Sequence, residues 1–505
     1  MKTFANTLFT LALLVLLQGC DSVIERTEPS TAVSQEVALT NPDAINGVRA
    51  SMYDRFHSND MSTDWLLGPS AIADNTFFRG NQGRHQELNR NELRAGIGTG
   101  AYGDLYNLIN DANILISGID AEALEEGEAD KLRAEGLFMR ALALHHAVRI
   151  FGYDPDGQGG LVSPASGPGA GFNLGVEIRT EPTLAVEDAT PTPRSTVSEV
   201  YTQIVNDLQE SISVFSSLSG DVLEGSPFFV SEAAAQGLLA RVNLYQRNYG
   251  EADTRAQNAI DAAAASFGSA LASGSDELTA IFDETTGSNP EAIFVISTNP
   301  ITESAGINNA ISAYTTLQWL AQLPTQDLVD LYEADDARLD AWYAPCFDEI
   351  NEVTPTGCDL INDNGFELTK WSAEQAPSQF ADDYVHLRIA EMYLIQAEAR
   401  LYESGISAAI TRLNDLRAER GASALDPADY ATEDDVLDEI LDERRRELVA
   451  EGHRFFDLKR LGRDIRKAPG TGRDDLTINN FHILDDLPAN QLEVNPELVQ
   501  NPGYQ

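Results

Sequence analysis

The chain has 505 residues, of which 80 are Asp or Glu and 34 are Lys or Arg, so its formal net charge is −46. This charge excludes an ordinary nucleic-acid-binding protein, because affinity for phosphate requires a basic surface. The acidic residues are spread along the whole chain, and their mutual repulsion is tolerated where salt screens it. We therefore expect a salt-adapted, halophilic source, with a merely acidic protein as the alternative.

The first twenty residues have the layout of an export signal. Lys2 is followed by an apolar run over residues 8–17, and Gly19 stands directly before Cys20. The run is too short to span a bilayer, which takes about 20 apolar residues. We expect residues 1–19 to be a signal peptide and acyl chains such as palmitate on Cys20 to anchor the protein. A plain secretory signal or an amino-terminal anchor helix is the alternative.

The rest of the chain divides into a tether and a body. Residues 20–40 are polar and lack periodicity, which predicts a lipidated flexible tether. Residues 41–505 are expected to form one body, with an N-terminal part over about 41–220 and a C-terminal part over about 221–505. No segment after Cys20 approaches transmembrane length.

Helical periodicity recurs through the body. Between residues 128 and 151, Leu137, Ala141, Leu144 and Val148 fall at spacings of four and three and therefore line one helix face. Similar patterns predict helices over 43–56, 102–119, 128–151, 196–217, 231–249, 250–265, 384–403, 407–420 and 433–461. Small residues at facing positions allow antiparallel hairpins that resemble tetratricopeptide-like units. The expected fold class is mainly α, with a helical hairpin scaffold and a long, loop-rich half.

Long Gly- and Pro-rich loops alternate with these helices, over residues 152–194, 268–290 and 343–368. The best strand candidate is 292–297. Loops of this length inside a compact domain are usually functional or disordered. Their aromatic content favours function, because flat aromatic faces stack on sugar rings. The aromatic candidates outside the strongest helical patterns are Trp65, Tyr314, Trp319, Trp342 and Trp371.

Polar candidates follow the first of these aromatics. Asp74, Asn75 and Arg79 come soon after Trp65 and can supply hydrogen bonds to a hydroxyl-rich ligand. Each aromatic taken alone is also explained as a core anchor. We therefore predict a ligand site near these residues as a group, although for each aromatic taken singly we favour the role of a core anchor.

One acidic loop holds the remaining cysteines. An exported location allows Cys346 and Cys358 to form a disulfide, and free buried cysteines are the alternative. Residues 359–365 carry oxygen ligands that suit Ca²⁺, although their spacing is not that of an EF-hand. No other metal or cofactor is expected.

The densest charged cluster lies between Glu443 and Asp457. Its acids and His453 offer general acid/base chemistry on one interpretation. On the other, apolar residues at helical spacing mark an amphipathic helix whose charges form ion pairs. We favour the second interpretation, and no catalytic motif occurs elsewhere in the chain.

Several segments, in the same order along the chain, resemble the SusD/RagB family of outer-membrane nutrient-binding lipoproteins. One runs from Ala134 to Ala141 and is followed by Phe151 and Gly152. Others resemble the family's R-x-A-E-x-Y-L helix, its E-R-x-x-E-L and E-G-x-R segment, and its ending, which here occupy residues 387–399, 443–460 and 487–504. The resemblance extends from Cys20 to the C-terminus.

The resemblance implies a tetratricopeptide-like scaffold and a non-catalytic function. It implies capture of a glycan or oligosaccharide at the cell surface and delivery to a TonB-dependent, SusC-like transporter in the outer membrane. Relatives often carry Trp at the position of Tyr102, so an aromatic ligand contact is expected there. A surface glycoside hydrolase and a tetratricopeptide-like scaffold for other proteins are the alternative functions.

Overall fold

The structure is a computed structural model. It describes residues 39–78, 85–91, 101–185, 188–282, 289–299, 306, 310–316, 321–345, 366–371, 380–467 and 474–504. Among these residues, no helix has both the length and the apolar character that crossing a membrane requires.

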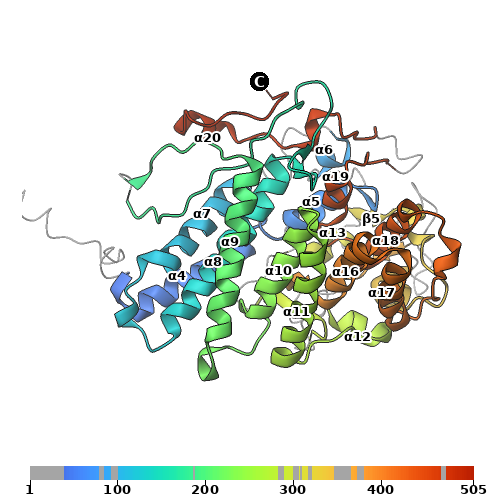
Figure 1. Cartoon of the computed structure of the whole chain (residues 1–505), viewed down its shortest axis with the longest axis horizontal. Coiled ribbons are helices and arrows are strands. Elements are labelled where there is room, and N and C mark those ends of the chain that lie inside the picture. The colour runs from blue at the N-terminus through green and yellow to red at the C-terminus, as the bar shows by residue number, and fades with distance from the viewer. Residues whose placement is uncertain are drawn as a thin grey trace, which may run out of the picture.

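The N-terminal helices form the first part of a helical layer. Helix α8 (Glu128–Phe151) packs between α7 (Ala101–Asn113) and α9 (Val197–Ser217), and α4 (Pro42–Asp54) lies against α7 (Figure 1). From Glu135 to Phe151 every side chain of α8 is buried, as expected of a helix enclosed on all sides. The bounds predicted for α8 are confirmed.

Two helical hairpins continue the layer. Helices α10 (Glu232–Tyr245) and α11 (Tyr249–Phe267) form the first, and α16 (Ile389–Ser404) and α17 (Ile406–Glu419) form the second (Figure 1). Helix α11 packs against α16, which joins the two hairpins. The facing residues Ala240, Ala252 and Ala397 are fully buried, so small side chains permit the close approach. The mainly helical fold is confirmed.

Two predicted helices differ from those observed. The segment 384–403 begins as strand β8 (Tyr384–Arg388), which pairs antiparallel with β4 (Ala292–Ile296), the strand that the sequence does predict. The segment 433–461 forms two helices, α18 (Glu433–Glu447) and α19 (Arg454–Arg460).

The break between α18 and α19 has a steric cause. Gly452 has a φ of +75°, and a Cβ atom at this position would lie 2.7 Å from the backbone oxygen of Trp65. Only glycine tolerates both the left-handed backbone and this close approach. The chain therefore turns where it meets the helix that carries Trp65.

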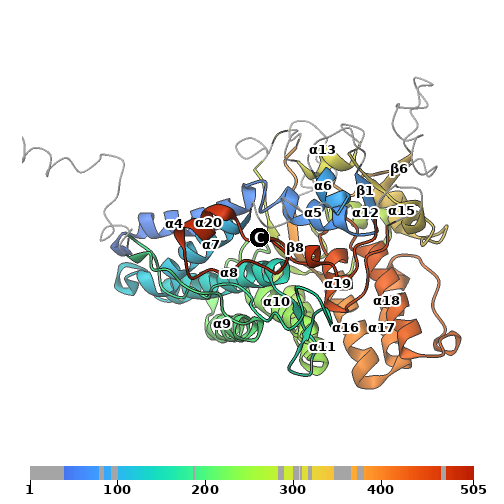
Figure 2. The same ribbon diagram turned by 90° about the horizontal axis from the view of Figure 1, so that it is seen from above.

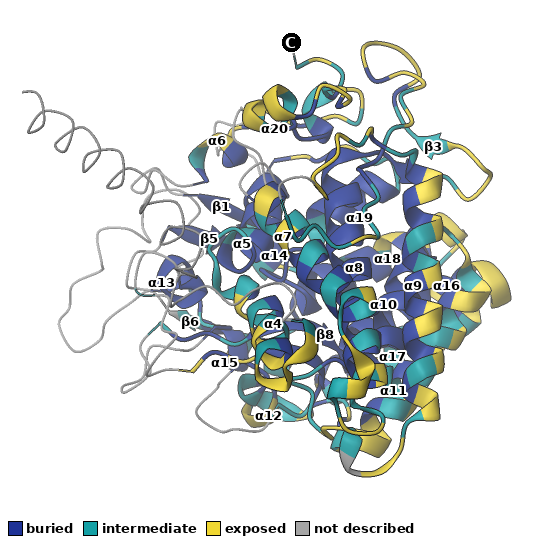
Figure 3. Cartoon of the chain, turned by 90° about the vertical axis from the view of Figure 1, so that its left-hand side faces the viewer, coloured by how far each residue is buried: buried dark blue, intermediate teal, exposed yellow. Residues whose placement is uncertain are grey.

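The remaining elements are short. They lie mostly on one side of the helical layer, opposite α9 and α17, as seen from above (Figure 2). The helices are α5 (Thr63–Ile72), α6 (Gln86–Asn89), α12 (Gly274–Ala280), α13 (Ile311–Thr315), α14 (Gln326–Val329), α15 (Ala337–Trp342) and α20 (Ala489–Val494). The other strand pairs are β1 (Thr76–Phe78) with β5 (Gln322–Pro324), β2 (Asp154–Pro155) with β3 (Leu161–Val162), and β6 (Tyr343–Pro345) with β7 (Phe366–Leu368). Strands β1, β5 and β8 are buried, whereas α20 is largely exposed (Figure 3).

The charged cluster of α18 is part of the interior. Glu443 is fully buried and accepts hydrogen bonds from Arg338 at 2.7 Å and from Arg417 at 2.8 Å. Asp457 accepts from Arg444 at 2.7 Å. Because these carboxylates already bind guanidinium groups inside the protein, the structural interpretation of the cluster holds.

Three buried histidines lie around α8. Two of them, His146 and His386, lie where α5, α8 and β8 meet, and His145 lies on the side of α8 that faces α9 and α10. His146 stacks on the Trp65 ring with centroids 3.2 Å apart, and His386 meets the same ring edge-on. His145 contacts the Tyr245 ring at 5.1 Å. Burial, reinforced by Arg149 and Arg241, lowers the pKa of His145 and of His146 well below the usual value. Burial, reinforced by Arg241, lowers the pKa of His386 to about 3.

We expect this cluster to make the protein sensitive to mild acid. Unfolded histidine binds a proton below about pH 6.5, whereas the folded histidines stay neutral, so stability falls as the pH drops through that value. Each histidine should cost about 1.4 kcal/mol between pH 7.5 and 5.5. Urea unfolding at the two pH values measures the loss, and His386→Phe should reduce it by about one histidine's share. Equal stability at both pH values would contradict the prediction.

Candidate functional site

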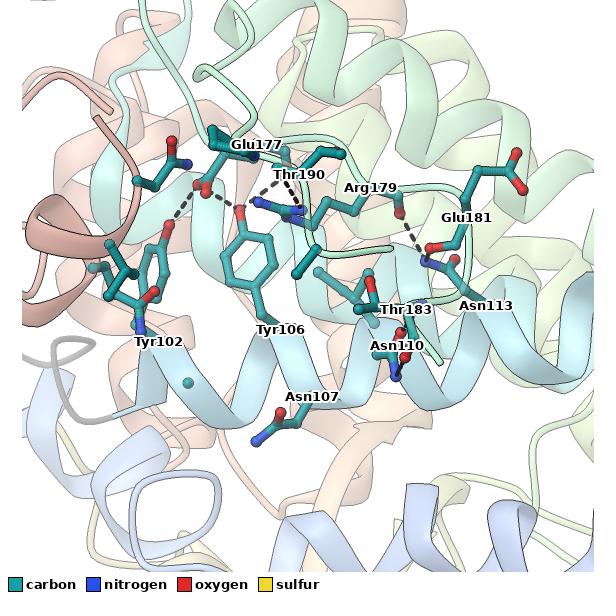
Figure 4. Close-up of a pocket in the computed structure, with 17 residues that line it drawn as sticks. Tyr102, Tyr106, Asn107, Asn110, Asn113, Glu177, Arg179, Glu181, Thr183 and Thr190 are labelled. Atoms are coloured by element: carbon teal, nitrogen blue, oxygen red, sulfur yellow. Dashed lines mark hydrogen bonds between the residues drawn. The ribbon is translucent and has the colours of Figure 1, made fainter. Parts of the chain in front are cut away.

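Helix α7 presents a row of polar side chains on one face. Tyr102, Tyr106, Asn110 and Asn113 follow one another at spacings of four, four and three residues, which places them one above another. All four face the extended segment 176–185 (Figure 4). This segment belongs to the Gly- and Pro-rich loop that precedes α9.

The two tyrosines hold one carboxylate. Both hydroxyl groups donate hydrogen bonds to the carboxylate of Glu177, with 2.9 Å between the Tyr106 oxygen and Oε2. Tyr106 also donates to the Glu177 backbone oxygen at 3.0 Å. Burial, with Glu177 beside it, raises the pKa of the Tyr102 hydroxyl, so this group stays protonated and donates. The start of the segment is therefore anchored to α7.

The two asparagines hold the backbone further along the segment. The Asn110 side chain donates to the Thr183 oxygen at 3.2 Å and accepts from the Thr183 N–H at 2.7 Å. Asn113 donates to the backbone oxygens of Arg179 and Glu181, each at 3.1 Å. These bonds bind the segment to α7 through main-chain atoms, so its side chains remain available for other contacts.

An open cavity of about 650 Å³ lies between α7, the segment 176–185, residues 189–191 and α20 (Figure 4). This volume falls within the range of small-molecule sites, about 300 to 1,000 Å³. Helix α20 closes one side, where the Asn495 side chain donates to the Thr192 oxygen at 2.9 Å. Val494 stands at the rim and is 73% exposed. The cavity lining is Tyr102, Gly103, Tyr106, Asn107, Ile109, Asn110, Asn113, Glu177, Arg179, Glu181, Thr183, Ala189, Thr190, Pro191, Gln491, Val494 and Asn495.

The lining suits hydrogen bonding to a polar ligand. Arg179 is half-buried and donates one bond to the Thr190 oxygen at 3.2 Å, and Glu181 and Thr190 are exposed. Amide, hydroxyl, guanidinium and carboxylate groups match the donors and acceptors of a polyhydroxyl compound. Among these lining residues there is no histidine or cysteine, and the buried carboxylate of Glu177 is held by two tyrosines.

Tyr102 is the one predicted ligand residue that lines this cavity. It is only 2% exposed, and its hydroxyl is bound to Glu177, so it forms part of the wall. Sequence reasoning assigned no role in a ligand site to Asn110, Asn113 or Glu177. The regular spacing of polar residues along α7 is the signal that was available for the two asparagines.

The other predicted ligand residues with described positions lie in the interior. Trp65 is 6% exposed and stacks on His146, and Tyr314 is 3% exposed among other rings. Asp74 binds Arg454 through two bonds of 2.8 Å, which outweigh burial and lower its pKa to about 2. In the structure, Trp65 and Tyr314 pack against other rings and Asp74 forms an ion pair. A contact between these residues and a ligand stays a prediction.

Asn75, directly before β1, is bonded to helix α18. It is 2% exposed, and its side-chain oxygen accepts a hydrogen bond of 2.8 Å from Arg445 of α18.

Trp342 and Trp371 are fully buried around the Phe282 ring. These side chains therefore serve the core in the observed structure.

Several predicted residues lie outside the described residues, namely Cys20, Arg79, Trp319, Cys346, Cys358 and residues 359–365. The lipid anchor, the disulfide and the Ca²⁺ site therefore stay predictions. Within the described ranges, no group of three His, Cys, Asp or Glu side chains is placed to hold a metal ion.

Comparison with known proteins decides the family. Residues 290–504 match the family model described as "SusD family", and residues 25–244 match a second model described as "Starch-binding associating with outer membrane". The chain belongs to the SusD family. This family consists of non-catalytic binding proteins, which confirms the expectation of a binding protein and not an enzyme.

Relatives extend along the full length of this SusD-family chain. SusD-like protein P2 of Formosa agariphila is 25% identical over 98% of both chains, and SusD-like protein P38 of the same species is 24% identical over all of both. A Bacteroides vulgatus structure described as sugar-binding is 25% identical, with a TM-score of 0.76 over 93% of this chain and all of the other. A SusD superfamily structure from Bacteroides thetaiotaomicron has a TM-score of 0.75 at 23% identity, over 92% of this chain and all of the other.

Proposed function

We propose that this protein captures a glycan or oligosaccharide at the cell surface and delivers it to a TonB-dependent, SusC-like transporter. The observation that supports this function best is the open, polar cavity on α7, whose walls are fixed by internal hydrogen bonds. A wall that is already ordered loses little conformational entropy when a ligand binds. Membership of a family of binding proteins associated with the outer membrane supports the same function.

A glycan panel tests the binding step. The purified mature protein is incubated with neutral and charged polysaccharides, and both retention of the polymer and release of small sugars are measured. We expect retention of at least one glycan without release of sugars. Release of small sugars would favour the hydrolase alternative, and retention of no glycan would contradict the proposal.

The delivery step requires a partner in the membrane. Purification of the protein from detergent-solubilised outer membranes should bring down one large transporter in near-equal amount. Recovery of many unrelated proteins without such a transporter would favour the scaffold alternative.

The proposed anchor at Cys20 makes a further prediction. Cys20→Ala removes the acylation site, so the protein should be released from the membrane while its affinity for the glycan stays within about twofold. Cell fractionation and binding of the released protein measure the two effects. Growth on the glycan should be lost, because a released protein no longer stays near the transporter. Retention of Cys20→Ala in the membrane fraction would show that the protein is held in another way.

A further inference from the structure

The basic side chains of this acidic protein are turned inward. In the described ranges, the four lysines are at most 9% exposed, and they are Lys131, Lys370, Lys459 and Lys467. Of the arginines in the same ranges, only Arg90 and Arg466 are exposed. The acidic excess of the chain therefore lies at its surface, with few surface cations to offset it.

The lining of the cavity on α7 likewise has more acidic than basic side chains. Arg179 is the single cationic residue of its lining, and it lies between Glu177 and Glu181 in the chain. One bond of the guanidinium is already directed to the Thr190 oxygen. A carboxylate or sulfate on a ligand would thus meet one partly engaged guanidinium and two carboxylates, and desolvating an anion without a strong partner is costly.

The rest of the lining suits an uncharged sugar. Thr190, Gln491 and Asn107 carry neutral hydroxyl or amide groups. Val494 and Pro191 add apolar surface at the rim, against which the C–H face of a pyranose ring can pack. Neutral hydrogen-bonding groups beside an apolar edge are complementary to a sugar ring that carries no charge.

We infer that this cavity takes uncharged glycan segments and excludes polyanionic ones. The inference rests on the proposed glycan-binding function and adds the chemical class of the ligand. Repulsion from the acidic surface reduces the approach of a polyanion, and it weakens when salt shortens the Debye length from about 10 Å at 0.1 M to about 3 Å at 1 M. Inside the cavity, an anionic group lacks a cationic partner at contact distance. This unfavourable effect acts at short range, so salt does not remove it.

The test compares one glycan with an oxidised form of itself. A neutral oligosaccharide that binds in the panel is treated so that its primary hydroxyl groups become carboxylates, and both forms are titrated calorimetrically at 0.05 and 1 M NaCl. The oxidised form should bind at least tenfold more weakly at low salt, and part of this difference should remain at high salt. Equal or tighter binding of the oxidised form would overturn the inference.

Two variants with the same change in net charge locate the effect. Glu181→Lys adds a cation at the cavity. Glu403→Lys adds one at an exposed position near the C-terminal end of α16, beside Gly250 and outside the cavity lining. Helix α16 lies apart from α7 and α20, which border the cavity (Figure 1). Glu181→Lys should tighten binding of the oxidised form about tenfold, and Glu403→Lys should change it less than twofold. Equal effects of the two variants would show that only the overall charge matters and would overturn selection by the cavity.

Failure of the inference is distinguishable from failure of the function. If neither form of any glycan binds to a folded protein, the proposed function itself fails. Two further variants, Val494→Asp and Arg179→Ala, test the cavity itself, provided that their melting temperatures are unchanged. If neutral glycans bind the parent protein and both variants with affinities within twofold of one another, the ligand binds elsewhere and the cavity is excluded as the site.

Discussion

Replacing Glu447 by Gln should lower the free energy of unfolding by about 3 to 5 kcal/mol, the usual cost of breaking a buried ion pair. Glu447 is fully buried, and its carboxylate accepts hydrogen bonds from Arg338, Arg388 and Arg420 at distances between 2.7 and 3.0 Å. Burial opposes its ionisation, but Arg420 and Arg388 outweigh burial and hold the pKa of Glu447 well below the usual value. A neutral amide would leave three buried guanidinium groups short of one negative charge.

Urea unfolding at neutral pH measures this loss. Glu433→Gln, at the exposed first turn of the same helix, is the matched control and should change stability by no more than about 0.5 kcal/mol. A loss below about 1 kcal/mol for Glu447→Gln would show that the arginines are compensated by the neighbouring acids Glu291, Glu443 and Glu451.

Replacing Trp65 by Ala should cost about 3 to 5 kcal/mol of stability, as large-to-small changes of buried aromatics do. The ring is 6% exposed and is covered by His146 on one face, with His386 against it edge-on. Its removal would open a cavity where α5, α8 and β8 meet. The sequence alone predicts a weaker ligand affinity for this variant, whereas the structure predicts a weaker fold.

Two measurements on Trp65→Ala separate these outcomes. Chemical unfolding reports stability, and glycan titration at a temperature where the variant remains folded reports affinity. We expect a large loss of stability and an affinity within twofold of the parent, with a smaller loss for Trp65→Phe, which keeps an aromatic ring. Weaker binding by a variant of unchanged stability would restore the ligand role of Trp65.

The helices could be predicted because their signals are local. Helix α9 begins after Thr196, whose side chain forms a capping box with Glu199, and α8 ends at Phe151, directly before Gly152. Periodic apolar residues between such signals determine which face is buried. The family motifs also follow from the sequence, and the charged cluster of α18 could be assigned to the scaffold because its charges alternate at helical spacing.

Contacts between distant segments decided what the sequence left open. Residues 384–388 follow a helical pattern but form strand β8, because β4, about 90 residues earlier, supplies the backbone partners. The helix predicted over 433–461 breaks at Gly452, where Trp65 approaches from almost 390 residues away. The sequence contains both partners of each contact, but its local patterns do not indicate that they meet.

The candidate site depends on the same kind of contact. The sequence by itself determined an acidic, mainly helical chain with SusD-family motifs and a regular row of polar residues on α7. It did not determine that Glu177, in an aperiodic Gly- and Pro-rich loop, would be held by Tyr102 and Tyr106. Only the tertiary structure turned these residues into a cavity, because a loop without periodicity takes its conformation from the surface to which it is bonded.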